Sequence, residues 1–254
     1  MTTLLGFYQE MGPALSLLVV GIFLLAGAVK GVIGLGLPTI AMGLLGLAMP
    51  PAQAAALLIV PSTLTNLWQL ATGGHLLALL RRLWSMLLMI FVGTLFGSAW
   101  LGIDSGPWVV HALGGALLVY ALYGMYGPGV QLAAEHEPWL GPLCGLITGV
   151  ITAATGVFVI PAVPYLQSLG LNRDQMVQAL GLSFTVSTLA LALGLAGQDA
   201  LGAEALGASL LVLAPALLGM LGGQWLRHRI SAVLFKRCFF VGLALLGVHL
   251  LLNG

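Results

Sequence analysis

Long apolar runs, separated by short polar or Gly/Pro-rich connections, cover almost the whole chain. A bilayer core of about 30 Å needs roughly 20 apolar residues in a helix that rises about 1.5 Å per residue. On that measure the pattern predicts about ten apolar elements, of which Leu35–Met49 and Gly156–Leu169 are too short to cross a membrane unaided. The other elements are expected at Ala14–Ile33, Ala52–Ala71, Trp84–Leu101, Trp108–Tyr126, Trp139–Ala154, Met176–Ala196, Leu206–Trp225 and Val233–Leu252.

The composition agrees with this pattern and sets the class of protein. Hydrophobic residues make up 60% of the 254 positions and charged residues only 6%, whereas a soluble domain carries roughly 25% charged residues. The chain is therefore expected to be an all-α polytopic membrane protein embedded in a lipid bilayer. It has no basic patch interleaved with aromatic residues, so no nucleic-acid partner is expected. Cys144 and Cys238 lie in apolar runs and are interpreted as packing residues.

The cationic residues predict how the chain is oriented. If it starts outside and crosses at each element, every loop Lys and Arg falls inside, and Glu10, Asp104, Asp199 and Glu204 fall outside. This is the positive-inside pattern, which predicts a cytoplasmic (inner) membrane protein with both termini outside. No Lys or Arg precedes the first apolar run, so that run is not expected to be a cleaved signal peptide. The acidic loop Glu135–Glu137 lies inside without a cation of its own. The inside residues are Arg81, Arg82, Arg173, Arg227, Arg229, Lys236 and Arg237.

The two halves of the sequence resemble each other. Five elements per half is an odd number, so the second half is expected to be inverted relative to the first, an architecture typical of transporters. The predicted repeats cover residues 1–127 and 138–254, with a short loop at about 127–138 between them. The matched positions are Lys30–Ile33 with Thr148–Ile151, Gln53 with Gln175, and Gly93–Gly97 with Gly219–Gly223, at offsets of 118, 122 and 126 residues.

The first repeat contains a Gly-rich interruption. Gly31, Gly34, Gly36 and Pro38 are expected to break the helix within or near the membrane. Irregular backbone at that depth is tolerated only where it is buried in protein or lines an aqueous cavity. The half-helix that follows would direct free N–H groups at the break, which favours an anion. The alternative is that these glycines only allow close helix packing.

The second repeat contains a related interruption. It comprises Gly149, Thr152, Thr155 and Gly156, followed by Pro161. The two threonine hydroxyls are candidate donors to an oxyanion. Alternatively, they bond to the helix carbonyl four residues earlier.

Lys30 is a basic residue that lies inside a predicted span. A charge at this depth indicates a functional site by default, and here it would provide positive potential for an anion. The alternative is that Lys30 extends its side chain to the interface.

Polar side chains follow in the third element of each repeat. Thr63 and Asn66 share one helix face, as Thr185 and Thr188 do. Such stripes either line a solute path or join helices. Gln53 and Gln175, near matched element ends, are expected to gate or cap that path, and Pro38 and Pro161 at the breaks are expected to line it. The alternative is that the two glutamines are simply solvated at the interface.

Several signatures of other functions are absent from the sequence. There is no Gly-x-Ser-x-Gly elbow, His-Glu-x-x-His pair or P-loop. His111 and His249 each stand alone in an apolar element, and the cysteines have no metal-ligand spacing. The sequence therefore predicts no enzyme, no metal site and no cofactor.

The segment Gly31-Val-Ile-Gly34-Leu-Gly36, with its apolar element and polar third span, resembles the TauE/SafE family of membrane proteins. Gly149 to Pro161 is similar to the second copy of that motif. The resemblance covers nearly the whole chain and implies export of a small sulfur-containing anion, such as sulfite or sulfoacetate, across the cytoplasmic membrane. Leu37 and Pro38, and Ala154 and Thr155 in the second copy, stand where the family often has glycine. These differences bear on the substrate rather than on the fold.

The leading interpretation is a secondary transporter that binds its anion between the two breaks and alternates access by rocking of the halves. Two alternatives remain, a passive anion channel and a non-transporting membrane assembly subunit. The Gly-rich faces at Gly93–Gly97 and Gly219–Gly223 suggest a homodimer or, equally, packing within one chain.

Overall fold

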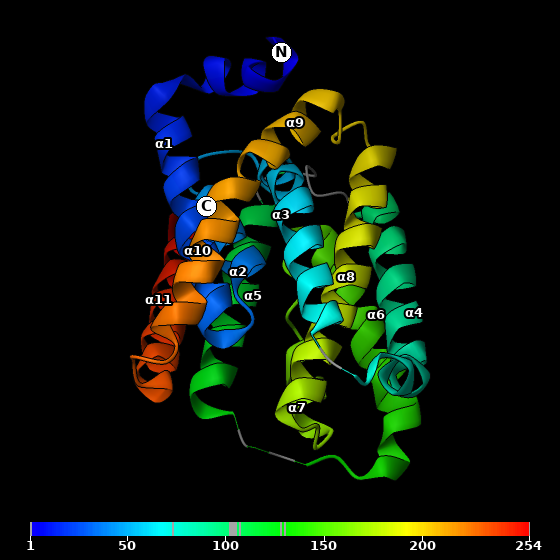
Figure 1. Cartoon of the computed structure of the whole chain (residues 1–254). Helices are drawn as coiled ribbons and strands as arrows, with labels where there is room; N and C mark the ends of the chain where they lie inside the picture. The colour runs from blue at the N-terminus through cyan, green and yellow to red at the C-terminus, as the bar shows by residue number, and fades with distance from the viewer. Residues whose placement is uncertain are drawn as a thin grey trace.

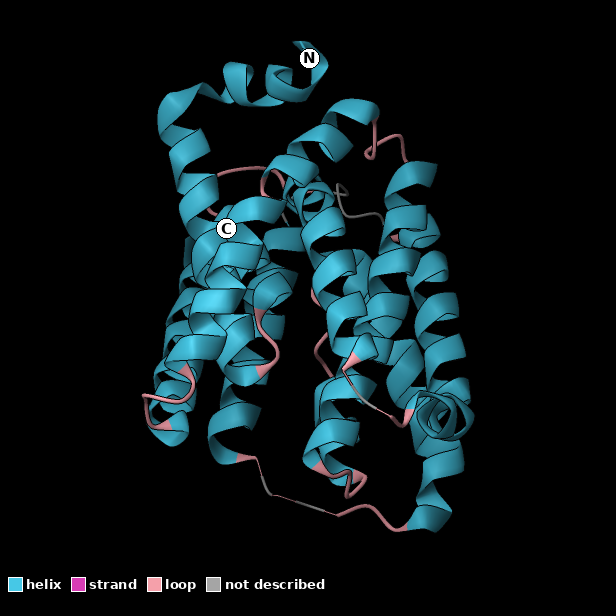
Figure 2. Cartoon of the chain, in the orientation of Figure 1, coloured by secondary structure: helices cyan, strands magenta, loops and turns pink. Residues whose placement is uncertain are grey.

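The computed structural model is built from helices joined by short connections, and the described part of the chain contains no strand (Figure 2). The structure describes residues 2–72, 74–101, 106, 108–127, 129 and 131–253, and side chains from residue 12 onward apart from Ala232. Asp104 and the side chain of Glu10, both expected outside, lie beyond this part. The helices are α1 (Thr2–Ile33), α2 (Leu37–Leu45), α3 (Pro51–Ala71), α4 (Leu76–Trp100), α5 (Trp108–Tyr126), η1 (Ala134–His136), α6 (Glu137–Thr155), α7 (Ala162–Ser168), α8 (Arg173–Gly197), α9 (Ala203–Leu211), α10 (Leu213–Leu226) and α11 (Ala232–Asn253).

Within the described residues, eight segments are long and apolar enough to span a membrane, which confirms the all-α polytopic class. The two remaining elements are short. Helix α2 has nine residues and α7 has seven, so they extend only about 14 and 10 Å, less than the hydrocarbon core. Most of their residues are buried in the bundle (Figure 1). Short helices are tolerated there because the surrounding protein shields their ends from lipid.

Several element boundaries differ from the expectation. Helix α1 begins at Thr2 rather than Ala14 and is kinked at Gly12, and α7 begins at Ala162 rather than Gly156. Helix α4 begins at Leu76 rather than Trp84, because the helix continues through Arg81 and Arg82 at its polar end. The predicted span Leu206–Trp225 is interrupted at Val212, so that it forms α9 and α10. Pro215 accounts for the interruption, because proline cannot donate the backbone hydrogen bond that would join the two helices.

The long helices pack in reciprocal pairs between the two halves of the sequence. Helix α1 packs against α10, and α6 packs against α4. A Cβ atom at Gly31 would collide with the Met220 backbone oxygen, and one at Gly149 would collide with the Ile90 oxygen. The matched glycines Gly31 and Gly149 thus occupy similar close crossings. This pairing is what two inverted repeats would produce, and the inverted repeat itself stays a prediction.

The Gly-rich faces considered for a homodimer are engaged within the chain. Gly93 and Gly97 lie against α6, and Gly219 and Gly223 lie against the backbone of α1. Packing inside one chain therefore accounts for these four glycines, and a homodimer stays a prediction.

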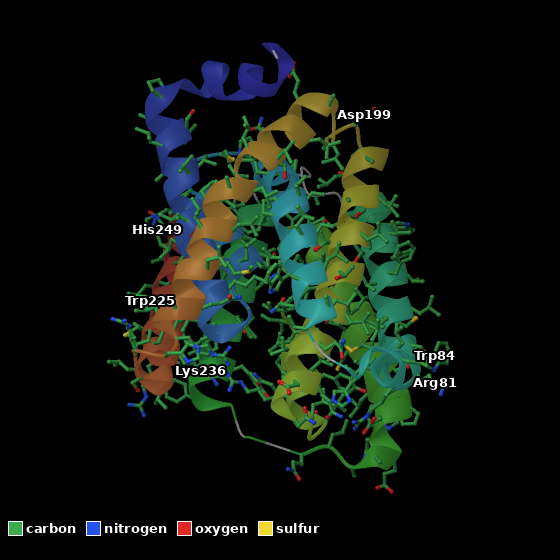
Figure 3. The ribbon with its side chains drawn as sticks, viewed as in Figure 1. Arg81, Trp84, Asp199, Trp225, Lys236 and His249 are labelled. Atoms are coloured by element: carbon green, nitrogen blue, oxygen red, sulfur yellow. The ribbon has the colours of Figure 1, made fainter. Side chains whose placement is uncertain are left out.

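Charged residues lie near the ends of the helices, and cations and acids differ in which end of the bundle they occupy. Arg82 on α4 donates from Nε and Nη2 to Glu137 at the start of α6, over 2.9 and 2.6 Å, and also donates to the Leu169 oxygen after α7. This contact explains the acidic loop, because its carboxylate pairs with a cation from α4. Arg81 and Lys236 lie at one end of the bundle and Asp199 lies at the opposite end (Figure 3).

Candidate functional site

A buried polar cluster surrounds Lys30 near the end of α1. The side chain is only 3% exposed, so Lys30 turns into the bundle instead of extending to the interface. Its Nζ donates to Thr65 Oγ1 over 2.9 Å and to Asn66 Oδ1, both on α3. Within the described residues no Asp or Glu forms an ion pair with it. When protonated, Lys30 is therefore a buried positive charge that only neutral oxygens compensate.

The first break lies one turn beyond Lys30. Helix α1 ends at Ile33, and α2 begins at Leu37 and lies beside it. Gly34 and Gly36 have φ of 80° and 112°, a conformation that side chains with a Cβ rarely adopt. Gln69 on α3 donates from Nε2 to the Gly34 oxygen, and so ties the break to the helix that holds Lys30. Pro38 is buried in the first turn of α2.

A cavity of about 270 Å³ joins this cluster to the end of α10. Lys30, Gly31, Gly34 and Gln69 contribute to its inner wall. Gln224, Arg227 and His228 on and after α10 complete the wall, together with Trp68, Thr72, Val177 and Met220. A cavity lined by a lysine and an arginine favours an anion. The cavity therefore combines a buried amine, irregular backbone and a second cation.

The second break has a different structure. Helix α6 ends at Thr155, Gly156 has φ of 69°, and α7 begins at Ala162 after Pro161. Thr152 and Thr155 donate to the carbonyl oxygens four residues earlier, Thr148 and Ile151, over 2.7 Å each. In this conformation their hydroxyl hydrogens are thus used by the helix. Gly149, Thr152, Thr155 and Gly156 are buried and do not line the cavity at Lys30.

The third-element residues divide into two groups. Thr63 and Thr185 donate to the carbonyls of Ile59 and Gly181, and both are half-buried. Asn66, in contrast, joins the two halves of the sequence, because its Nδ2 donates to Thr188 Oγ1 on α8 over 3.3 Å. The structure therefore brings Lys30, Asn66 and the first break together and leaves Thr63 and Thr185 outside this cluster.

The expected gating glutamines lie at helix starts. Gln175 accepts from the Asn172 backbone N–H while Asn172 accepts from that of Gln175, a capping box that begins α8. Gln53 is exposed near the start of α3. A role of Gln53, Gln175, Pro38 or Pro161 in the path stays a prediction.

Several residues of the cluster do not stand out in the sequence, namely Thr65, Gln69, Gln224 and Arg227. Thr65, Asn66 and Gln69 share one face of α3. The spacing of Thr65 and Gln69 relative to Asn66 could therefore have predicted these two residues. Buried polar atoms of α3 and α8 also lack a hydrogen-bond partner in the described structure, namely Ser62 Oγ, Gln69 Oε1, Ser183 Oγ and Ser187 Oγ.

One comparison with known proteins decides the family. The family model described as Sulfite exporter TauE/SafE matches residues 19–250. The chain belongs to the TauE/SafE family. This match confirms the resemblance seen in the Gly-rich motifs. Neither a curated protein nor a solved structure matches the chain.

TauE/SafE proteins are membrane transporters rather than enzymes, and the family implies transport of a small anionic solute. The eight spanning segments agree with a multi-pass membrane protein. In the described residues no group of three or more His, Cys, Asp or Glu could hold a metal ion.

Proposed function

We propose that this TauE/SafE protein is a secondary transporter that exports a small sulfur-containing anion, such as sulfite or sulfoacetate, with Lys30 at its binding site. The observation that carries the proposal is the burial of Lys30 with no Asp or Glu of the described residues paired to it. Burying an ion costs several kcal/mol unless it is compensated. A soluble anion that enters the adjoining cavity would supply the missing negative charge.

The cavity also supports a direction for the path. It connects Lys30 with Arg227 and His228, and the positive-inside rule assigns the end with the loop cations to the cytoplasm. The protein then lies in the cytoplasmic membrane with both termini outside. Moving one negative charge outward at −100 mV releases about 2.3 kcal/mol, so the membrane potential alone favours export.

Alternating access is the mechanism that the arrangement supports. The hydrogen bond between Asn66 and Thr188 joins the third elements of the two halves beside Lys30. Gly156 in the second break lies against the Met42 side chain of α2, the helix that follows the first break. A movement of one half relative to the other would therefore change the contacts at both breaks. Rocking about α3 and α8 would close the cavity on the α10 side and open a path past Thr152 and Thr155.

The test is counterflow of radiolabelled sulfite and sulfoacetate in anaerobic proteoliposomes. Wild-type protein should show saturable uptake that is accelerated by the same anion loaded on the far side. Lys30→Met should abolish this uptake, whereas Arg81→Gln, which removes a positive charge outside the cavity, should retain it.

Other outcomes would select the alternatives. High flux without counterflow acceleration would identify a passive anion channel. No flux of either anion from well-folded wild-type protein would contradict the export of these sulfur anions and favour a non-transporting assembly subunit. Counterflow that survives Lys30→Met would move the site away from Lys30.

A further inference from the structure

A second cavity lies between the ends of α5 and α11, away from the polar cluster at Lys30. Its volume is about 530 Å³, within the roughly 300–1,000 Å³ of small-molecule sites. The wall is largely apolar, and Tyr126, Val233 and Val241 on it are exposed at the surface of the bundle. Lys236 and Arg237 contribute the positive charge of the wall. We refer to this cavity as the apolar chamber.

A smaller cavity of about 150 Å³ adjoins the apolar chamber. Both are lined by Gly124, Lys236 and Phe240. The smaller one, the polar chamber, also reaches Gln167 and Ser168 at the end of α7. Lys236 thus borders an apolar space on one side and a polar space on the other.

The wall between the chambers is closely packed. The Phe240 ring lies against Gly124, where a Cβ atom would overlap it, and meets the Tyr120 ring edge-on at 5.3 Å between centroids. Lys236 Nζ lies 5.7 Å from the centroid of the Phe240 ring. The Lys236 amine therefore lies over the Phe240 ring where the two chambers meet.

The charges around the chambers have one sign. Neither chamber is lined by Asp or Glu among the described residues, and Lys236 lies at the end of the bundle that also carries Arg81 (Figure 3). Basic pockets between membrane helices on the cytoplasmic side bind the head groups of anionic lipids. An apolar space, a cation and a small polar space lie next to one another here. They match the acyl chain, the phosphate and the polar head group of a phospholipid, which follow one another in the same order.

We propose that the two chambers form a binding site for one anionic phospholipid. The acyl chain lies in the apolar chamber along α11, the phosphate lies at Lys236 and Arg237, and the polar head group enters the polar chamber beside Gln167. Because two cations line the site without an acid, a zwitterionic choline head group would bring a positive charge that finds no partner. The site selects anionic over zwitterionic lipid for that reason.

The proposal is tested with purified, delipidated protein in neutral detergent. Phosphatidylglycerol and phosphatidylcholine with identical acyl chains are added in turn, and bound lipid is counted by native mass spectrometry while the unfolding temperature is recorded. Wild-type protein should retain one phosphatidylglycerol and unfold at a higher temperature with it than with phosphatidylcholine. Lys236→Gln should bind phosphatidylglycerol about fivefold more weakly, and the matched variant Arg81→Gln should bind like wild type.

Two further arms separate a lipid from a soluble phosphate and test the apolar chamber. Excess glycerol 3-phosphate should not displace the lipid, because it lacks the acyl chain. Val241→Trp should weaken lipid binding by filling the apolar chamber while both cations remain. Equal binding of the two lipids, displacement by glycerol 3-phosphate, or wild-type binding by Lys236→Gln would each overturn the proposal.

Discussion

Asn66 on α3 donates from Nδ2 to Thr188 Oγ1 on α8 over 3.3 Å, and its Oδ1 accepts from Lys30 Nζ. Asn66 and Thr188 are 122 positions apart, the offset that also relates Gln53 to Gln175. Thr188 donates its own hydroxyl hydrogen to the Phe184 oxygen over 2.7 Å, so its oxygen is available to accept. Thr188 therefore orients the Asn66 amide with its oxygen toward Lys30.

Thr188→Val should disturb this orientation while keeping the volume of the side chain. The Asn66 amide would lose its acceptor on α8, and hydrogen bonds between membrane helices contribute about 0.6–1.7 kcal/mol. We expect a loss of stability in that range, measured by unfolding in detergent, together with weaker anion counterflow. Thr188→Ser keeps the oxygen and should restore both properties. Equal counterflow in all three proteins would show that the orientation of Asn66 is unimportant.

Lys30→Met should separate function from stability. Removing the amine leaves Asn66 Oδ1 without a donor, which costs about 1–3 kcal/mol. It also removes a buried charge, whose effective cost is several kcal/mol. We therefore expect the unfolding temperature to be unchanged or higher while anion transport is lost. A large fall in stability would indicate instead that Lys30 serves mainly to join α1 to α3.

Gly31→Ala should destabilise the protein through the crossing of α1 and α10. The added methyl would overlap the Met220 backbone oxygen, and overpacking of this kind costs about 1–3 kcal/mol. Gly21 lies on the same helix, and a Cβ atom there would have no neighbour within 4 Å, so Gly21→Ala is the matched control. Unfolding measured by size-exclusion chromatography after heating should separate the two variants. Equal unfolding temperatures of Gly31→Ala and Gly21→Ala would contradict the close crossing of α1 and α10.

Arg227→Gln should slow anion binding from the cavity side. Arg227 lines the cavity that leads to Lys30. Arg229 does not line this cavity, and its guanidinium carbon Cζ lies 4.0 Å from the centroid of the Trp225 ring. We expect kcat/KM for the anion to fall about tenfold in Arg227→Gln, because a charge at a cleft raises the rate of association. Arg229→Gln should stay near the wild-type value. The difference should shrink at high ionic strength, where screening is stronger, and an effect that persists there would indicate direct binding instead.

Much of the fold could be predicted because it depends on composition and local pattern. Apolar length determines a spanning helix, and the described part of the chain contains eight such segments. The first break was also predictable, because Gly34 and Gly36 interrupt the helix through their own backbone conformation. Both adopt positive φ between α1 and α2. The split of the span at Val212 was not predicted, because Pro215 lies within a strongly apolar run whose length alone suggests one continuous helix.

The candidate site was only partly predictable. Lys30 and Asn66 stood out as polar residues in apolar segments, and the structure places them in contact. The sequence also favoured Thr63 over Thr65, but Thr65 is the residue that meets Lys30. Both threonines are on α3, and which of them points inward depends on how that helix is rotated against α1. Arg227 was assigned only to a loop, because its place beside Lys30 requires α10 to cross α1.

The sequence by itself determined the membrane class, the approximate spans, the Gly-rich interruptions and the family, because hydrophobicity, glycine content and motif spacing act over short stretches of chain. Tertiary structure alone decided that Lys30 bonds to Thr65 and Asn66, that Asn66 reaches Thr188, and that the cavity continues to Arg227. These contacts join residues that are far apart in the chain, and they depend on the rotation and crossing of packed helices. No local pattern of residues specifies those quantities.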